Sequence, residues 1–413
     1  MEEPRLLRPF TFYFTFIILS ILTTCESVDP GDKNGQEQLP TFTYRIVETA
    51  VSDCYDNHQK ITNPSPGDPF YGQDGNYTGY HAAYEDNGDG TITDQVTGLM
   101  WQKDMGEKKS FDSAKASTSN FNLAGYNDWR IPTIKELYSL IQFTGMNGGS
   151  PESSIFFIND AYFLQPWGDT EAGERYIDAQ TWSSSQYVGT TMNNNETVFG
   201  VNFVDGRIKG YPLNKPGSSI PNEMYFRLVR GNSSYGINDF VDNSDGTVSD
   251  IATGLMWQQA DDGIARNWEE ALAYAESLEH AGYGDWRLPN AKELHSIVDY
   301  SRAPDVTGSP AIHLLFSCTE IEDPLGNAGQ YPYYWTGTTH MDGPDPENAA
   351  VYIAFGEAQG WMHEQLLDVH GAGAQRSDPK SGDPGDYPDY WGPQGDVRYV
   401  FNYVRCVRDM PVK

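Results

Sequence analysis

Apolar residues recur in short runs along the chain, and the sequence of one run is repeated. The sequence Thr-Gly-Leu-Met-Trp-Gln occupies residues 97–102 and again residues 253–258. An Asp-Gly pair between apolar residues precedes each run, which predicts a tight β-hairpin turn. The runs are too apolar to be exposed contacts. We therefore expect each run to form a core strand of its own domain, with these side chains inside: Leu99, Met100, Trp101, Leu255, Met256 and Trp257.

Helical signals follow each hairpin. Asn267 can cap a helix over residues 268–282 with Gly282 as its stop, and a weaker helix is expected after Ser110. A second helix in each copy follows an Asp-Trp-Arg motif and begins with capping-box spacing, Thr133-x-x-Glu136 and Asn290-x-x-Glu293. The order of hairpin, two helices and short strands predicts an α+β fold.

These motifs recur at domain-sized spacing and divide the chain. The expected parts are a signal peptide (1–24), a tether (25–41), a lead-in segment packed on the first domain (42–83), a first domain (84–231) and a second domain (237–413). The second domain carries a Gly-, Pro- and Asp-rich insertion at residues 366–396. Its composition argues against a regular element. Its aromatic residues indicate an ordered loop, either packed on itself or used for binding.

The N-terminus has the features of an export signal. Residues 10–22 form an apolar run of signal-peptide length that is too short to span a bilayer, and Arg5 and Arg8 precede it. The residues before Cys25 resemble a bacterial lipobox, so Cys25 is a candidate lipidation site, with simple cleavage nearby as the alternative. We expect an outer-membrane or cell-surface lipoprotein that touches the membrane only through this lipid, or otherwise a periplasmic or secreted protein.

The net charge narrows the classes of partner. The chain of 413 residues has a formal net charge of −31, and residues 237–413 hold 10 basic and 29 acidic groups, a net −19. Such a surface repels phosphate backbones, which argues against nucleic acid as a partner. A solvated surface explains the acidity without a bound cation.

The four cysteines leave the disulfide pattern open. If Cys25 carries lipid, Cys318 and Cys406 are the natural pair in an oxidising compartment, and Cys54 is left over. Four cysteines allow three pairings, so spacing alone does not decide. The sequence has no Cys-x-x-Cys motif or Cys/His cluster that would indicate structural zinc.

Taken together, the motifs resemble one bacterial family. The segments DNGDGTITDQVTGLMWQ and AGYNDWRIPTIKEL and the closing VRCVR are similar to the Lcl-type C-terminal domain, and both copies carry the pattern, over residues 84–231 and 240–409. The resemblance implies two tandem C-type-lectin-like domains with short antiparallel sheets, two helices each and long loops. It also implies an exported or lipid-anchored protein without assigned catalytic residues. The naming member is a collagen-like adhesin that binds sulfated polysaccharides.

This chain departs from that family pattern. It has no collagen-like tract, and its acidity disfavours sulfated polyanions as ligands. It also lacks the cysteine that often follows the CYDN segment, because residues 61–66 read ITNPSP. We therefore do not carry over sulfated-glycan binding.

The acidic hairpin turns are candidate metal sites, with calcium as the candidate cofactor. Calcium prefers several oxygen ligands from one loop. Neither turn fits an EF-hand loop, however, because no Glu stands at its last position, so tight turns without a cation are the simpler interpretation. The candidate ligands are Asp86, Asp89, Asp94, Asp242, Asp245 and Asp250.

Aromatic residues of the insertion are the candidate ligand-binding residues: Tyr387, Tyr390 and Trp391. Two other repeated features are better explained by structure. The Asp-Trp-Arg tryptophans are expected in the core. The arginines of the closing strands are expected to pair with carboxylates: Arg227, Arg230, Arg405 and Arg408.

Catalytic motifs are scarce. None of the eight histidines recurs at the same place in both copies, and neither HExxH nor GxSxG occurs. A non-catalytic, surface-exposed binding or adhesion protein that recognises glycan or a protein partner is the favoured function. One alternative is a structural envelope component. The other is an extracytoplasmic enzyme that uses His363, Glu364, Asp368 or His370 of the second domain.

Overall fold

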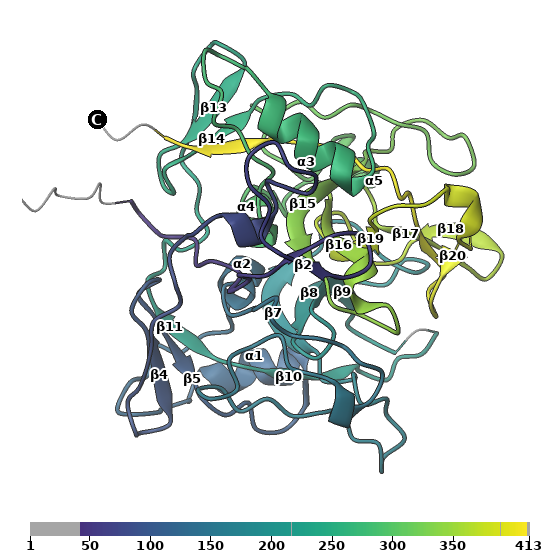
Figure 1. Cartoon of the computed structure of the whole chain (residues 1–413). Coiled ribbons are helices and arrows are strands. Elements are labelled where there is room, and N and C mark those ends of the chain that lie inside the picture. The colour runs from purple at the N-terminus through teal and green to yellow at the C-terminus, as the bar shows by residue number, and fades with distance from the viewer. Residues whose placement is uncertain (1–41, 216, 389, 411–413) are drawn as a thin grey trace, which may run out of the picture. The chain divides into compact units, whose positions relative to one another are not determined.

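The computed structural model describes residues 42–215, 217–388 and 390–410. Both repeats lie in one compact unit, Phe42–Lys413, of mixed α/β composition in which strands predominate (Figure 1). The expected signal peptide and tether, with Cys25, lie outside the described residues. None of the helices in the described ranges combines the length and hydrophobicity that a bilayer crossing requires.

Each repeat begins with the predicted hairpin and core strand, and the last strand of the repeat completes a four-stranded sheet. The first sheet, in the order β11-β5-β4-β3, consists of β3 (Tyr84–Asp86), β4 (Thr91–Asp94), β5 (Leu99–Gln102) and β11 (Val229–Gly231). The second, in the order β12-β13-β14-β22, consists of β12 (Phe240–Asp242), β13 (Thr247–Asp250), β14 (Leu255–Gln258) and β22 (Val407–Asp409). Trp101 and Trp257 are fully buried, which confirms the predicted core strands, although Met100 is only half-buried.

The helices begin at the predicted caps. Capping boxes form at Thr133 and Asn290, and Asn267 caps the longest helix, because these side chains accept backbone N–H groups that a first helical turn leaves unpaired. The described residues form α1 (Phe111–Thr118), α2 (Ile134–Tyr138), α3 (Trp268–Ser277), α4 (Ala291–Ser296) and α5 (Pro304–Thr307). Since α5 is an additional short helix, two helices describe the first repeat but not the second.

One eight-stranded sheet runs through both repeats (Figure 1). Its strands, in spatial order, are β15 (Tyr333–Thr339), β16 (Ala349–Ala354), β19 (Gln375–Pro379), β9 (Arg207–Pro212), β8 (Thr197–Asn202), β7 (Thr181–Gln186), β10 (Glu223–Phe226) and β6 (Lys109–Ser110). The neighbours are antiparallel except β10 and β7, which are parallel. The repeats meet where β19 lies beside β9, with Gln375 opposite Ile208. Backbone pairing therefore crosses the boundary between the repeats.

The insertion is more regular than its composition predicted. A further four-stranded sheet, in the order β18-β17-β21-β20, consists of β17 (Gln359–Met362), β18 (Gln365–Asp368), β20 (Tyr390–Trp391) and β21 (Asp396–Val397). The insertion also contains β19 of the large sheet. The expectation of an irregular loop was wrong because backbone pairing with distant strands orders these residues despite their glycines and prolines.

The lead-in segment, which includes β1 (Cys54–Tyr55) and β2 (Lys60–Ile61), packs on both repeats and not only on the first. The Tyr44 N–H donates to the Ala252 carbonyl of the second repeat at 3.2 Å. The Thr49 carbonyl accepts the Phe143 N–H of the first repeat at 2.9 Å. The segment therefore runs between the repeats.

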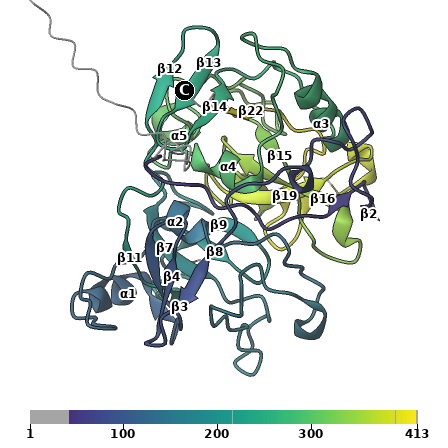
Figure 2. The ribbon, with the colours of Figure 1, turned by 60° about the vertical axis from the view of Figure 1, so that its left-hand side comes forward.

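The helices α2 and α4 are neighbours at the junction of the repeats (Figure 2). A reciprocal pair of lysines joins them. Lys135 of α2 donates to the Ser296 carbonyl at the end of α4 at 2.6 Å. Lys292, at the matching position of α4, donates to the Ser139 carbonyl after α2 at 2.8 Å. Burial lowers the pKa of Lys135 to about 8 and that of Lys292 to about 7. Each lysine therefore caps the helix of the other repeat. The strands β7, β8 and β9 and their counterparts β15, β16 and β19 meet in reversed order across the antiparallel β9–β19 pair, so an approximate two-fold axis relates the repeats.

The expected Cys318–Cys406 disulfide is not formed, and the three cysteines of the described ranges are unpaired. Successive side chains of an extended segment point to opposite sides. Arg405 points toward Cys318, with its Nη2 3.5 Å from the sulfur. Its neighbour Cys406 points away, into a buried cluster with Trp335. The two thiols lie on opposite sides of the closing segment.

The four closing arginines fall into two classes by their main partners, and the expected pairing with a carboxylate is found for three of them: Arg230, Arg405 and Arg408. Arg230 and Arg408 form ion pairs with the aspartates of the two Asp-Trp-Arg motifs. Arg227 and Arg405 are fully buried and donate mainly to backbone carbonyls. The tryptophans of both motifs, Trp129 and Trp286, are buried as expected.

Candidate functional site

Two exposed tryptophans lie on the small sheet of the second repeat. Trp361 in β17 is 36% exposed and Trp391 in β20 is 53% exposed. No other tryptophan in the described ranges is this accessible. We call Trp361, Tyr390, Trp391 and Arg398 the aromatic platform.

The rings of the platform occupy both faces of the sheet. Tyr390 stacks on Trp361, with ring centroids 5.3 Å apart and an angle of 19° between the ring planes. Trp391 follows Tyr390 in the strand and therefore points to the opposite face. There the Arg398 guanidinium lies 4.0 Å from the Trp391 ring centroid. Tyr387 lies further out, with its ring centroid 5.9 Å from the same guanidinium.

The sequence prediction found two of the four platform residues, Tyr390 and Trp391, and the adjacent Tyr387, but missed Trp361 and Arg398. Trp361 lies before residue 366, where the insertion was expected to begin. It is placed by a hairpin whose turn residues, His363 and Glu364, have φ angles of 53° and 62°. Asn-Gly and Asp-Gly are the usual signals for such a turn. His-Glu is not, so this hairpin had no recognisable signal in the sequence.

Two glycines let β17 and β21 approach each other beneath Trp361. A Cβ on Gly395, whose φ is 63°, would lie 2.3 Å from the Trp361 carbonyl oxygen. A Cβ on Gly360 would lie 2.5 Å from the Gln394 carbonyl oxygen. The Trp361 N–H donates to the Gly395 carbonyl at 2.7 Å. The position of the Trp361 ring therefore depends on both glycines.

A buried charge network connects the platform to the junction between the repeats. Asp396, directly across from Trp391 in the sheet, pairs with Arg376 and with His370 Nε2, the latter at 2.7 Å. Burial acts to raise the pKa of Asp396, but Arg376 and His370 hold it well below its usual range. Burial lowers the pKa of His370 to about 4. The His370 carbonyl accepts the N–H of Gly210 in β9 at 2.7 Å, which ties the network to the first repeat.

The residues of the enzyme hypothesis are not brought together. His363 and Glu364 are exposed at the tip of the β17–β18 hairpin. Asp368 lies at its base and accepts a hydrogen bond from the Tyr187 hydroxyl at 2.7 Å. Burial and the nearby Glu357 raise the pKa of Asp368 to about 8. His370 is engaged with Asp396, so these residues do not share one reactive centre.

The aspartates of the acidic turns bond to their own backbone. Asp86 accepts the Gly88 N–H at 3.0 Å, and Asp242 in the other repeat accepts the Ser244 N–H at 2.8 Å. The remaining candidates accept backbone N–H groups in the same manner: Asp89, Asp94, Asp245 and Asp250. Within the described ranges, no group of three or more His, Cys, Asp or Glu side chains is placed to hold a metal ion. Tight turns without a cation remain the simpler interpretation, and calcium binding at these turns is the alternative.

Excess calcium is expected to leave the melting temperature unchanged, because these carboxylates already satisfy backbone donors. Thermal unfolding with calcium and with a chelator measures this. A ligand that binds only the folded state raises the melting temperature. A rise that Asp86→Asn and Asp242→Asn abolish would show instead that the turns bind calcium.

The family model of the Lcl C-terminal domain matches residues 90–230 and 246–367. Both matched segments begin within the hairpins, and the second ends before β19 and before β20 and β21 of the small sheet. No curated protein and no solved structure matches the chain. Because the two matched segments together cover more than half of the chain, the resemblance is confirmed, and the chain belongs to the Lcl C-terminal domain family, with two copies of the domain in tandem.

Proposed function

We propose that this protein is a non-catalytic binding protein of the bacterial surface that recognises uncharged carbohydrate through the aromatic platform. The observation that carries the proposal is the pair of exposed tryptophans, Trp361 and Trp391, on one small sheet. An amphipathic aromatic ring offers a flat apolar face to a ligand whose edges remain hydrated. A sugar ring has the same character, with apolar C–H groups on its faces and hydroxyls on its edges.

The two faces of the small sheet offer different contacts to a sugar. On one face, Tyr390 backs the Trp361 ring. On the other, Arg398 covers one side of the Trp391 ring, and the ring remains half exposed. The Arg398 guanidinium can donate to hydroxyl groups of a sugar stacked beside it. We therefore propose that a branched or extended glycan contacts the edge of the sheet and both tryptophans.

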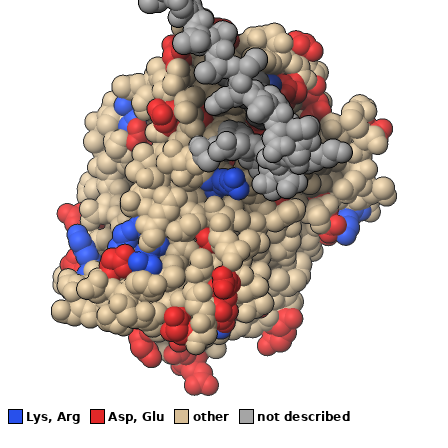
Figure 3. Space-filling view, turned by 90° about the vertical axis from the view of Figure 1, so that its left-hand side faces the viewer, with Lys and Arg blue, Asp and Glu red and all other residues tan. Residues whose placement is uncertain are grey.

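The net charge of −31 supports an uncharged ligand over a sulfated one. On the face in Figure 3, most of the surface is uncharged, and several basic side chains lie directly beside acidic ones. The C-type-lectin-like fold and export with a lipid on Cys25 belong to the same proposal. Such an anchor would hold the platform outside the cell.

Glycan-array binding of the purified protein tests the proposal, with and without calcium. Trp361→Ala and Trp391→Ala are each expected to weaken binding about tenfold, or about 1.4 kcal/mol, because each removes a stacking surface. Tyr126→Ala is the matched control. Tyr126 is 40% exposed and lies under an arginine, with the Arg230 guanidinium 3.7 Å from its ring centroid, but it belongs to the first repeat. Absence of binding on the array, or equal effects of all three substitutions, would overturn the proposal.

A further inference from the structure

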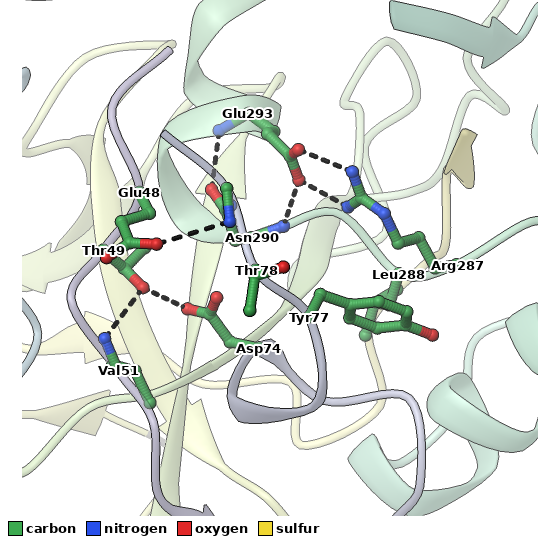
Figure 4. Close-up of a pocket in the computed structure, with 11 residues that line it drawn as sticks. Glu48, Thr49, Val51, Asp74, Tyr77, Thr78, Arg287, Leu288, Asn290 and Glu293 are labelled. Carbon is green, nitrogen blue, oxygen red and sulfur yellow. Dashed lines mark hydrogen bonds and ion pairs between the residues drawn. The ribbon is translucent and has the colours of Figure 1, made fainter. Parts of the chain in front are cut away.

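In the second repeat, the lead-in segment covers a groove at the start of α4 (Figure 4). One carboxylate oxygen of Asp74 accepts hydrogen bonds from the Thr338 and Thr49 hydroxyls, both at 2.7 Å. The Thr338 hydroxyl also accepts the N–H of Ala291, the first residue of α4, at 3.0 Å. Residues 336–340 are all buried beneath this contact. A turn that carries a carboxylate is therefore the natural occupant of this groove.

The corresponding groove of the first repeat is open. Ser185 occupies the position of Thr338 and accepts the N–H of Ile134, the first residue of α2, at 3.0 Å. Among the described residues, none accepts a hydrogen bond from the Ser185 hydroxyl. Ser184 and Gln186 beside it are exposed, unlike their counterparts in the second repeat. The first repeat therefore has the same strand and helix start that hold the lead-in segment in the second repeat, but no segment of the described chain covers them.

Ser185 lines a cleft of about 450 Å³ between the repeats. The cleft is bounded by the start of α2, by the linker that follows the first repeat and by residues 297–300 of the second. Two lysines make matching contacts beside the grooves. Lys135 donates to the Gly236 carbonyl beside the open groove, and Lys292 donates to the Glu48 carbonyl beside the covered one. The approximate two-fold axis therefore relates the open cleft to the volume that the lead-in segment fills.

We propose that this cleft is a docking site for a peptide turn of a protein partner, held in the first repeat as the lead-in segment is held in the second. A carboxyl or carboxamide oxygen of the turn accepts the Ser185 hydroxyl. Asp239 and Asp299 also line the cleft, where a lysine or arginine of the partner would add an ion pair that the lead-in sequence lacks. Ile237, which is 62% exposed at the cleft, offers an apolar contact. The proposal does not depend on the carbohydrate function.

The two grooves differ at one position that controls how deeply a turn can enter. A Cβ on Gly337 would lie 3.1 Å from the Asp74 nitrogen, so the lead-in segment approaches a glycine closely. Ser184 stands at this position in the first repeat and brings a side chain. A peptide turn bound in the first repeat therefore lies further from the strand that carries Ser184. Replacing Ser184 with glycine removes this side chain and lets the lead-in sequence approach as closely as it does at Gly337.

Titration with a labelled peptide of residues 70–78, FYGQDGNYT, tests the proposal by fluorescence anisotropy. The peptide is expected to bind Ser184→Gly about threefold more tightly than the unchanged protein and Ser185→Ala about threefold more weakly. A peptide with Asp74→Ala is the matched control and is expected to lose binding. Because Ser184 is exposed and Ser185 half-buried, both protein variants should fold, which circular dichroism verifies.

Three outcomes would overturn the proposal. The first is no binding to Ser184→Gly. The second is binding that Ser185→Ala leaves unchanged, which would place the peptide elsewhere, such as on the second repeat in exchange for the lead-in segment. The third is displacement of the peptide by a glycan that binds the protein, which would assign the cleft to carbohydrate. If the peptide binds the cleft while glycan binding fails, the proposed carbohydrate function falls and this proposal stands.

Discussion

Replacing Arg405 with methionine is expected to lower the free energy of unfolding by about 3–5 kcal/mol. The side chain is fully buried, and its guanidinium donates to the carbonyls of Gln258, Gln259 and Ser317 at 2.7–2.8 Å. It also lies 3.8 Å from the buried carboxylate of Asp261. Methionine fills similar space but donates no hydrogen bond. The variant therefore leaves three carbonyls and one carboxylate without their cationic partner.

The control is Arg408→Met in the same closing segment. Arg408 pairs with Asp285, whose side chain is 64% exposed, so the loss should be about 1 kcal/mol or less because water can solvate the released carboxylate. Urea unfolding followed by circular dichroism measures both variants. Equal losses at the two positions would contradict the division of these arginines into carbonyl-binding and carboxylate-pairing classes. Arg227→Met in the first repeat is expected to behave like Arg405→Met.

Lys292 is expected to make the protein more stable as the pH rises from about 7 to about 9. Burial lowers its pKa from 10.5 to about 7, although Asp94 and Asp74 act in the opposite direction. Between these values the unfolded chain binds more protons at this residue than the folded protein does. Raising the pH therefore favours the folded state, by up to about 1.4 kcal/mol per pH unit.

Lys292→Met should remove this contribution and flatten the rise of unfolding free energy with pH. Urea unfolding at several pH values, compared with the unchanged protein, isolates the residue, since the other titrating groups contribute to both. Lys60→Met is the control, because the Lys60 side chain is 60% exposed and pairs with a half-exposed Asp53. If Lys292→Met and Lys60→Met changed the pH dependence equally, the charge of Lys292 would not be coupled to folding.

The site was only partly predictable from sequence. Tyr390 and Trp391 were expected to bind a ligand because aromatic residues stood in a Gly- and Pro-rich insertion. Their neighbours on the platform were not found, since Trp361 stands about thirty residues before Trp391 and reaches it only through the pairing of β17, β21 and β20. The Cys318–Cys406 prediction failed for a related reason. Sequence spacing says nothing about which side of a strand a thiol faces.

The sequence by itself determined the features that depend on a few neighbouring residues. An Asp-Gly turn bends its own hairpin, and Thr133 and Asn290 cap helices that begin at the next residue. The doubled motifs also determined the tandem organisation and the family. Only the tertiary structure decided what depends on distant contacts. These features include the pairing of β19 with β9 and the placing of Trp361 beside Tyr390. They also include the lead-in segment, which covers one of two related grooves. The repeated motifs do not reveal from sequence which groove is filled, because the position of the lead-in segment is set by its packing against residues that are distant in the chain.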